Sequence, residues 1–439
     1  MQHGCIANRH LKQSLQQPLN DIPAFNPMTI AKSNGERLAR LKARRKLWLD
    51  VHLYLGLIVG AILAVVGLTG GILVFYQEMQ EVLNPELAIV SAPPENQQKL
   101  HSLDDIVAAA ETAKPQGSRF FKVYYPRNPD VAYKFLYFVR NESQANNGDG
   151  YYIFVDPYTA QVKGIQLWHP KDRYRGRPLV SFIMQLHWCL LLGKTGGILN
   201  GILAALSIIS VLTGLIVWWP LTGKFKQALT FKRNAGVARF NFDLHKTVGF
   251  YMTIVLLPVL FSGIYFNLPD QVNVLVKLFS KTDRPNAFST VPVAIHSSPP
   301  QAGRQTISVS EVEAIVQERS PAGKLWMLNA PKDRGDVYTV MKNDVTEISR
   351  FTGYRDFAVD QYSGDILKVY DRGAGSAGDV FLDWQWPLHS GHAFGWTGRI
   401  LVFLSGLACP VLYVTGVIRW LQKRRANHLR TKRSVLETP

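Results

Sequence analysis

Four long apolar stretches alternate with polar segments along this chain of 439 residues. They lie near residues 48–76, 195–220, 246–269 and 391–418. A helix needs roughly 20 apolar residues to cross the hydrocarbon core of a bilayer, and each stretch is that long. Core helices of water-soluble proteins do not need such long uncharged runs. The pattern therefore predicts an integral membrane α-helical protein with four transmembrane helices.

The two long polar segments between these stretches each predict an α+β domain. Each begins with a serine N-cap and apolar residues at helical spacing, from Ser102 and from Ser308. Alternating strand patterns follow, and each segment ends in a hairpin whose turn starts at Asp156 or Asp360. Because the elements recur in the same order, we expect an internal duplication with two such domains.

The net charge of +17 is concentrated beside the apolar stretches. Basic residues precede the first stretch, fill the segment between the second and third, and follow the fourth. The positive-inside rule places all three groups on the cytoplasmic side. We therefore expect cytoplasmic N- and C-termini, periplasmic α+β domains, and membrane lipid rather than nucleic acid beside the basic residues.

These patterns divide the chain into nine segments. The three cysteines lie outside the bulk of both α+β domains, so no disulfide framework is expected there. The predicted segments are 1–35 (disordered cytoplasmic tail), 36–76 (basic flank and first span), 77–186 (first periplasmic domain), 187–220 (second span), 221–242 (cytoplasmic basic loop), 243–269 (third span), 270–388 (second periplasmic domain), 389–421 (fourth span) and 422–439 (cytoplasmic basic tail).

A histidine recurs near the start of each apolar stretch, in register with a Thr-Gly or Ser-Gly dipeptide further along. An ionisable side chain in a membrane is costly unless it has a partner, which favours a functional site over histidines bonded to headgroups or carbonyls. In one repeat His52 and Thr69-Gly70 correspond to His245 and Ser262-Gly263; in the other His187 and Thr213-Gly214 correspond to His389 and Thr415-Gly416.

The predicted topology pairs these histidines by the side of the membrane. His52 and His245 lie just inside cytoplasmic helix starts, whereas His187 and His389 lie where the chain enters from the periplasm. Two histidines on facing helices can supply axial nitrogen ligands on both sides of one haem iron. We therefore predict two bis-histidine b-type haems. No Cys-x-x-Cys-His motif is present, so covalent attachment is not expected.

Several nearby residues are further candidates for this site. Gly56, Gly60 and Gly249 would leave room for a flat macrocycle between helices. His392 follows His389 by three residues, on what should be the same helix face, as a supporting group or a substrate contact. His187 is expected on a helix extension or a bent segment, because more than two turns separate it from Gly196.

A basic run before His187 contains Arg173, Arg175 and Arg177. Most basic runs at membrane interfaces anchor to lipid headgroups. The alternative is that one or two of these arginines neutralise haem propionates or an anionic substrate.

The aspartate hairpins and the histidine-led helix pairs together make residues 46–421 resemble the PepSY-associated transmembrane family. One departure is Ala160, which stands where the hairpin usually has glycine. The resemblance implies a bacterial inner-membrane protein connected with iron uptake. Some members of the family are di-haem cytochromes that act as ferric-siderophore reductases.

We therefore expect a haem-dependent membrane oxidoreductase. Electrons from a cytoplasmic or quinol donor would cross by way of the two histidine pairs and reduce a periplasmic ferric siderophore, an acceptor that rests on the resemblance alone. Reduction would release the metal, because hard oxygen chelators hold Fe(II) much less tightly than Fe(III). One alternative is a non-catalytic protein whose PepSY domains bind or regulate a periplasmic protein or peptidase. Another is a siderophore or iron permease, which the lack of carboxylates within the spans disfavours.

Overall fold

The computed structural model describes residues 27–139, 148–170, 177–220, 223, 225–232, 236–283, 295–299, 305–345 and 353–436. The chain divides into two units, residues 1–50 and 51–439. Of the first unit, residues 27–50 are described, and they are helical. The candidate residues Arg173 and Arg175 lie outside the described residues, as does most of the predicted tail 1–35.

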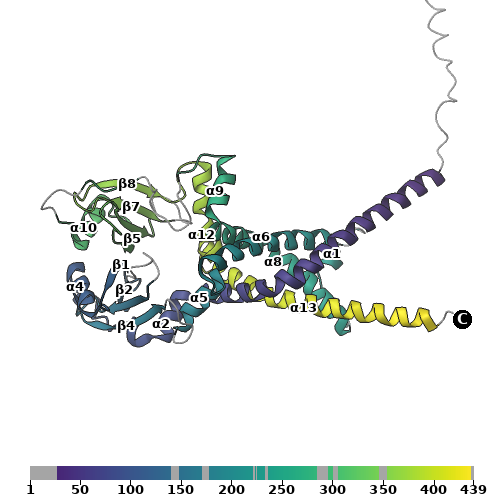
Figure 1. Ribbon diagram of the computed structural model, residues 1–439, viewed down its shortest axis with the longest axis horizontal. Coiled ribbons are helices and arrows are strands. Elements are labelled where there is room, and N and C mark those ends of the chain that lie inside the picture. The colour runs from purple at the N-terminus through teal and green to yellow at the C-terminus, as the bar shows by residue number, and fades with distance from the viewer. Residues whose placement is uncertain are drawn as a thin grey trace, which may run out of the picture. The chain divides into compact units, whose positions relative to one another are not determined.

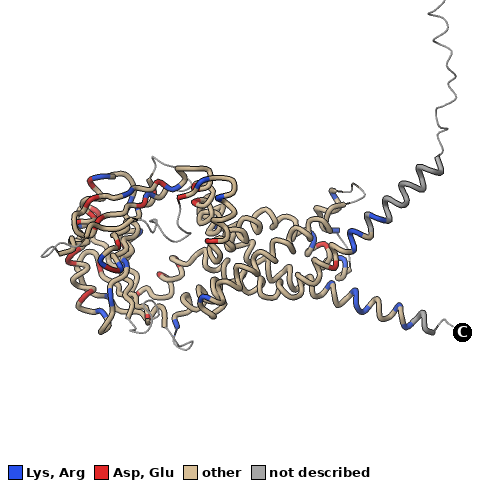
Figure 2. The backbone as a smooth tube through the Cα atoms, turned by 45° about the horizontal axis from the view of Figure 1, so that its top comes forward, with Lys and Arg blue, Asp and Glu red and all other residues tan. Residues whose placement is uncertain are grey.

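Among the described residues, four helices are long and apolar enough to cross a membrane. They belong to α1 (Pro27–Leu73), α6 (Gly193–Trp218), α8 (Val237–Asn267) and α13 (Gly395–Leu436). The predicted number of long apolar helices is confirmed, and the protein is a membrane protein. Past its apolar part, α13 continues with exposed basic residues (Figure 2), namely Lys423, Arg424, Arg425, Arg430 and Lys432.

Helices α1 and α13 approach each other closely through glycine. A Cβ atom added to Gly406 would lie 2.5 Å from the carbonyl oxygen of Gly67 and 2.8 Å from the Cα of Gly71. Small residues allow such backbone contact between membrane helices, where lipid gives no hydrophobic drive to associate. Helix α8 packs against both α6 and α13.

Two short helices precede the second and fourth long helices, each with a sharp break between them. Helix α5 (Leu179–Cys189) ends at Leu190 and Leu191, whose φ angles are 53° and 61°. Helix α12 (Gln385–Ser390) ends at Gly391 with φ 79°, and the 3₁₀ turn η3 (His392–Phe394) follows. His389 and His392 therefore lie on different elements, and the expectation that they share one helix face is wrong.

The strands form one antiparallel sheet of eight, in the order β4-β3-β2-β1-β5-β6-β7-β8. Two separate α+β domains are expected from the sequence, but pairing of β1 with β5 joins their sheets. The strands are β1 (Ser118–Tyr124), β2 (Tyr133–Val139), β3 (Gly150–Val155), β4 (Val162–His169), β5 (Lys324–Asn329), β6 (Tyr338–Asn343), β7 (Arg355–Val359) and β8 (Ile366–Asp371).

Each half of the sheet, β1–β4 and β5–β8, follows one helix, α4 (Leu103–Ala113) or α10 (Val309–Arg319). Both helices cover the same face of the sheet and share one apolar core with it (Figure 1). The remaining short helices are α2 (Tyr76–Leu83), α3 (Pro85–Ala88), η2 (Glu95–Gln97), α7 (Phe225–Ala228), α9 (Pro269–Lys277) and α11 (Ala377–Asp383).

The N-termini of α4 and α10 contact each other. The predicted serine N-caps are confirmed, since Ser102 accepts a hydrogen bond from the Asp105 amide and Ser308 from the Glu311 amide, each at 3.1 Å. Asp104 of α4 also accepts hydrogen bonds from the Ser308 hydroxyl and the Ser310 amide, each at 3.1 Å. A carboxylate at a helix N-terminus is stabilising, so α4 helps to cap α10.

Candidate functional site

The structure brings the four repeated histidines together as two facing pairs. The ring centroids of His52 on α1 and His245 on α8 are 6.1 Å apart. Those of His187 on α5 and His389 on α12 are 5.9 Å apart. All four rings keep part of their surface accessible. These are the two pairs that the predicted topology places on opposite sides of a membrane.

The Nδ1 atom of every ring in the two pairs already has a partner on a long helix. Two of them donate to backbone carbonyls, His52 to Ser210 on α6 and His187 to Val66 on α1, each at 2.9 Å. The other two lie 2.9 Å from side-chain hydroxyls, His245 from Thr415 on α13 and His389 from Ser262 on α8.

The hydroxyl contacts fix the direction of the hydrogen bonds. The Thr415 hydroxyl donates to the Val411 carbonyl at 2.7 Å, and the Ser262 hydroxyl donates to the Pro258 carbonyl at 2.8 Å. A hydroxyl has a single proton to donate, so each of these oxygens accepts from the histidine. All four rings therefore carry their proton on Nδ1 and leave Nε2 as a free lone pair.

A glycine lies against each imidazole, one residue after the Thr or Ser. A Cβ added to Gly70 would lie 2.5 Å from Cε1 of His187, and one added to Gly214 would lie 2.9 Å from Cε1 of His52. The corresponding distances are 3.4 Å from Gly416 to His245 and 3.9 Å from Gly263 to His389. In the sequence these dipeptides are only markers of the repeat, whereas in the structure they form the surfaces on which the rings rest.

The Thr or Ser hydroxyl of each dipeptide also lies within hydrogen-bond distance of the carbonyl three positions earlier. In Thr69, Ser262 and Thr415 it shares its proton between this carbonyl and the nearer one four positions earlier. The hydroxyl proton therefore has an acceptor within its own helix, so the polar side chain is satisfied inside an apolar stretch. The four hydrogen bonds are Thr69 to Val66 at 3.0 Å, Thr213 to Ser210 at 2.9 Å, Ser262 to Val259 at 2.9 Å and Thr415 to Leu412 at 3.1 Å.

The spacing within each pair would allow both imidazoles to hold one metal between them. A metal–nitrogen distance of about 2.0 Å puts an imidazole centroid about 3 Å from the metal, so two axial rings are about 6 Å apart. Within the described ranges, no group of three His, Cys, Asp or Glu side chains is placed to hold a metal ion. Two nitrogen donors suit the axial positions of haem iron, whose other ligands come from the macrocycle, better than a four-ligand zinc site.

The two pairs lie at different levels along the long helices. In α1, 18 residues separate His52 from Gly70, the residue against His187, and the same number separates His245 from Gly263 in α8. At 1.5 Å per residue this corresponds to about 27 Å along the helix axis. That distance is close to the roughly 30 Å thickness of the hydrocarbon core.

The other candidates of the sequence differ in their surroundings. A Cβ at Gly56 would have no heavy atom within 4 Å, and one at Gly249 would make an ordinary contact with Leu412 at 3.6 Å. A Cβ at Gly60 would lie 3.3 Å from Tyr413. His392 is exposed on η3. Arg177 binds the side chain of Gln185 on α5 and the carbonyl of Pro170.

A buried arginine connects α13 with the segment that follows α1. Arg399 is 9% exposed and donates to the Glu78 carboxylate at 2.8 Å and to the Val74 carbonyl at 2.9 Å. Its guanidinium lies 4.6 Å from the ring centroid of Trp396. Arg399 is not among the residues that the sequence indicates, because a lone arginine after a membrane boundary is typical of a headgroup contact.

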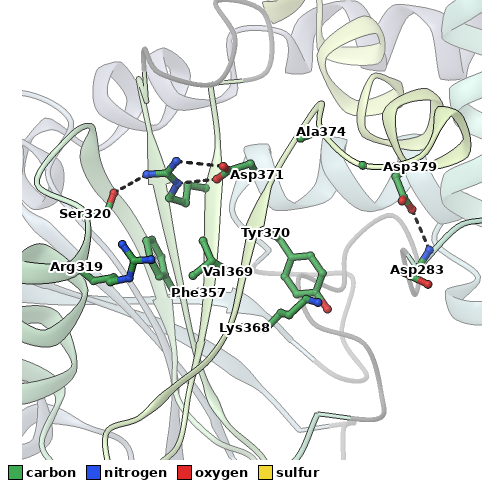
Figure 3. Close-up of a pocket in the computed structure, with 12 residues that line it drawn as sticks. Asp283, Arg319, Ser320, Phe357, Lys368, Val369, Tyr370, Asp371, Ala374 and Asp379 are labelled. Atoms are coloured by element: carbon green, nitrogen blue, oxygen red, sulfur yellow. Dashed lines mark hydrogen bonds and ion pairs between the residues drawn. The ribbon is translucent and has the colours of Figure 1, made fainter.

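A cavity of about 510 Å³ lies at the free edge of the sheet, beside β8 (Figure 3). Its volume is in the range of small-molecule sites. Two of its charged side chains pair with each other, since Arg355 binds Asp371 at 2.6 Å, and the Asp379 carboxylate accepts from the Asp283 amide at 2.9 Å. Its wall includes the start of α11, which leads into α12 and His389.

The model of the family described as PepSY-associated TM region matches residues 49–423. The chain belongs to this family. The match includes all four paired histidines and both halves of the sheet, so the PepSY-associated assignment covers the whole of the candidate site. No match to the chain is found among curated proteins.

Proposed function

We propose that the protein is a di-haem b cytochrome that carries electrons across the bacterial inner membrane to a periplasmic ferric siderophore. The observation that supports this most directly is the pair of facing imidazoles at each level, 6.1 and 5.9 Å apart, with Nδ1 occupied and Nε2 free. Haem held at each pair supplies reversible one-electron transfer.

Hydrogen bonds from other helices fix the protonation of the four histidines. Each Nδ1–H bond keeps one ring nitrogen protonated and leaves Nε2 unprotonated, as a metal ligand requires. Donation of the other N–H to a protein acceptor also raises the basicity of the ligating nitrogen. The glycines have no side chain on the helix surface behind each ring, so each imidazole can pack directly against the backbone there.

We further propose that the two sheet halves and their helices derive from an internal duplication, that the sheet is periplasmic, and that both termini are cytoplasmic. The basic residues beside the long helices support this orientation. A quinol or a cytoplasmic reductant is the donor. Oxidation of one quinol releases two electrons and two protons, enough to reduce two Fe(III) complexes to Fe(II), which oxygen chelators release.

Absorption spectroscopy of detergent-purified protein tests the proposal. We expect a six-coordinate low-spin spectrum and about two haems b per chain by pyridine haemochrome. His52→Ala or His245→Ala should leave about half of the haem, and so should His187→Ala or His389→Ala. The matched control is His101→Ala, since His101 is exposed and remote from both pairs.

Unchanged haem content in all four ligand variants would reject the assignment of the histidines. A colourless protein from haem-replete cells would reject the cytochrome itself and favour a PepSY protein that binds or regulates a periplasmic partner. With haem present, oxidation of the dithionite-reduced protein by ferric siderophore, in the absence of oxygen, tests the acceptor separately.

A further inference from the structure

Two lysines of the first sheet half lie among aromatic rings on the face opposite α4 and α10. The Nζ of Lys134 is 4.8 Å from the ring centroids of Tyr124 and Tyr152 and 5.7 Å from that of Tyr76. The Nζ of Lys122 is 5.6 Å from the Tyr124 ring. We call Tyr76, Lys122, Tyr124, Lys134 and Tyr152 the Lys–Tyr cluster.

Neither ammonium group donates to an oxygen atom within the part of the chain that the structure describes. The polar contact of Lys122 is the Sδ of Met327 at 3.6 Å. Removal from water lowers the pKa of both lysines to about 8. The neighbouring charge of Lys332 lowers the pKa of Lys122 further.

Charges around Lys134 offset one another, since Glu81 raises its pKa and Arg127 lowers it. Arg127 itself is bound to the Glu81 carboxylate at 2.6 Å. That carboxylate is therefore already neutralised by another cation. A desolvated ammonium without an acceptor is costly, so an anion bound at the cluster would be stabilised by the two lysines.

The second sheet half provides an internal comparison. Val123 of β1 pairs with Leu328 of β5 at the joint, which aligns the positions of the two halves. In this alignment Thr339 takes the place of Lys134, and Asp356 takes the place of Tyr152. Asp356 is bound by Arg372 at 2.7 Å. The charge of Asp356 is thus paired in the second half, whereas Lys122 and Lys134 of the first half have no oxygen acceptor among the described residues.

Two short connections along the chain link the cluster to the His187–His389 pair. The Trp168 ring contacts the Tyr152 ring in a tilted arrangement, with centroids 5.0 Å apart, and meets the Tyr76 ring edge-on at 5.8 Å. The Trp168 carbonyl accepts from the Ser181 hydroxyl of α5. His187 follows Ser181 by six residues of α5, or about 9 Å along the helix. Tyr76 in turn follows Gly70, the residue against His187, by six residues.

We propose that the Lys–Tyr cluster binds the anionic oxygen surface of an iron(III) chelate that carries net negative charge. The identity of the ligand as an iron(III) chelate rests on the proposed function. Its charge follows from the two unpaired ammonium groups, which gain charge-assisted hydrogen bonds only from an anion. The tyrosine rings supply an apolar wall around them, where such bonds are stronger than in water.

Binding is measured with redox-inert gallium(III) complexes and the purified full-length protein, by equilibrium dialysis at pH 7. Gallium(III) citrate, which is anionic, should bind at least about tenfold more tightly than neutral tris(acetohydroxamato)gallium(III). Lys122→Gln and Lys134→Gln should each weaken citrate-complex binding by about tenfold, and Lys134→Arg should retain most of it. The matched control is Lys324→Gln, at an exposed position that begins β5.

The pH profile gives a second readout. Anion binding should weaken as the pH rises above about 8, where free Lys122 and Lys134 lose their protons, and Lys122→Gln/Lys134→Gln should remove this dependence. Equal binding of the neutral complex, or wild-type affinity in both lysine variants, would overturn the proposal. Metal-free citrate that binds as tightly as its gallium complex would also overturn it.

Failure of this inference is distinguishable from failure of the proposed function. Gallium binding requires no electron transfer, so the dialysis remains informative if the protein contains no haem. Two haems per chain with unaltered ligand binding in the lysine variants would reject the cluster and leave the cytochrome intact. The absorbance of the variants and their melting temperatures report whether the fold is preserved.

Discussion

At the scale of single residues, the candidate site is four copies of one arrangement. A histidine from one helix rests on a glycine of another, and its Nδ1–H is directed to a carbonyl or hydroxyl on the same turn. The hydrogen bonds are 2.9 Å at all four rings, although the acceptor is a carbonyl in two copies and a hydroxyl in the other two. Selection of one imidazole nitrogen is therefore built into the fold.

The glycine beneath each ring is the most direct place to test this arrangement. In Gly70→Ala the new methyl group would lie 2.5 Å from Cε1 of His187, well inside van der Waals contact, so the ring must move. We expect loss of about half of the haem absorbance, with the other half unchanged. Gly236→Ala is the control, because its methyl group meets nothing within 4 Å and it lies nine residues before His245. Full haem retention in Gly70→Ala would show that the ring has another position.

The hydroxyl acceptors allow a finer test. Thr415→Val keeps the shape of the side chain but removes the oxygen that accepts from His245 at 2.9 Å, whereas Thr415→Ser keeps the oxygen. Because this hydrogen bond tunes the basicity of the ligand, Thr415→Val should shift one midpoint potential on the order of tens of millivolts. Thr415→Ser should stay near the wild-type value. Redox titration followed at the haem absorbance separates this outcome from a uniform loss of haem.

At the scale of elements, the breaks before α6 and α13 determine where two of the histidines lie. Leu190 and Leu191 adopt positive φ angles that residues with a Cβ rarely adopt, and Gly391 does so without strain. Hydrophobicity is continuous through the first break, so the apolar pattern alone cannot locate it. The sequence leaves open a helix extension or a bent segment for His187, and the structure has a separate short helix.

A side-chain hydrogen bond across the break between α5 and α6 gives a further prediction. Asn200 of α6 donates to the carbonyls of His187 at 2.9 Å and Trp188 at 3.3 Å, which lie at the end of α5. Asn200→Ala leaves these carbonyls without that donor and should lower the free energy of unfolding by about 1 kcal/mol. We expect weaker haem retention at the His187–His389 pair only. Asn427→Ala, at an exposed position of α13, is the control and should change neither property.

At the scale of the whole molecule, the sequence predicts the repeated helices, caps and histidines. It does not predict the strand pairing that joins the two halves of the sheet. The long helices and the serine caps have local signals, and the histidine pairs follow from register. The pairing of β1 with β5 has no such signal, because Val123 and Leu328 are brought together from distant parts of the chain. In the sequence, Lys134 is indistinguishable from other strand lysines. Its distinguishing feature, three neighbouring tyrosine rings, arises only in the fold.

The unpaired lysines of this joined sheet predict how the stability of the whole protein depends on pH. Burial lowers the pKa of Lys122 and Lys134 to about 8 in the folded protein, whereas an unfolded lysine titrates near 10.4. Between about pH 8 and 10.4 the unfolded chain therefore binds more protons than the folded chain, and stability increases with pH. Below about pH 8 both states are protonated and the contribution of these lysines is constant and unfavourable.

Thermal unfolding of the detergent-purified protein, without added anions, measures this dependence. We expect the melting temperature to rise between pH 8 and 9.5, and Lys134→Met to flatten the rise and raise the melting temperature at pH 7, where it removes a buried charge. Lys324→Met, at an exposed lysine of the same sheet, should leave the profile unchanged. An equally steep rise in Lys134→Met would assign the pH dependence to other groups. Addition of an anion that fills the Lys–Tyr cluster should suppress the rise, because an ion pair restores the lysine pKa towards its unfolded value.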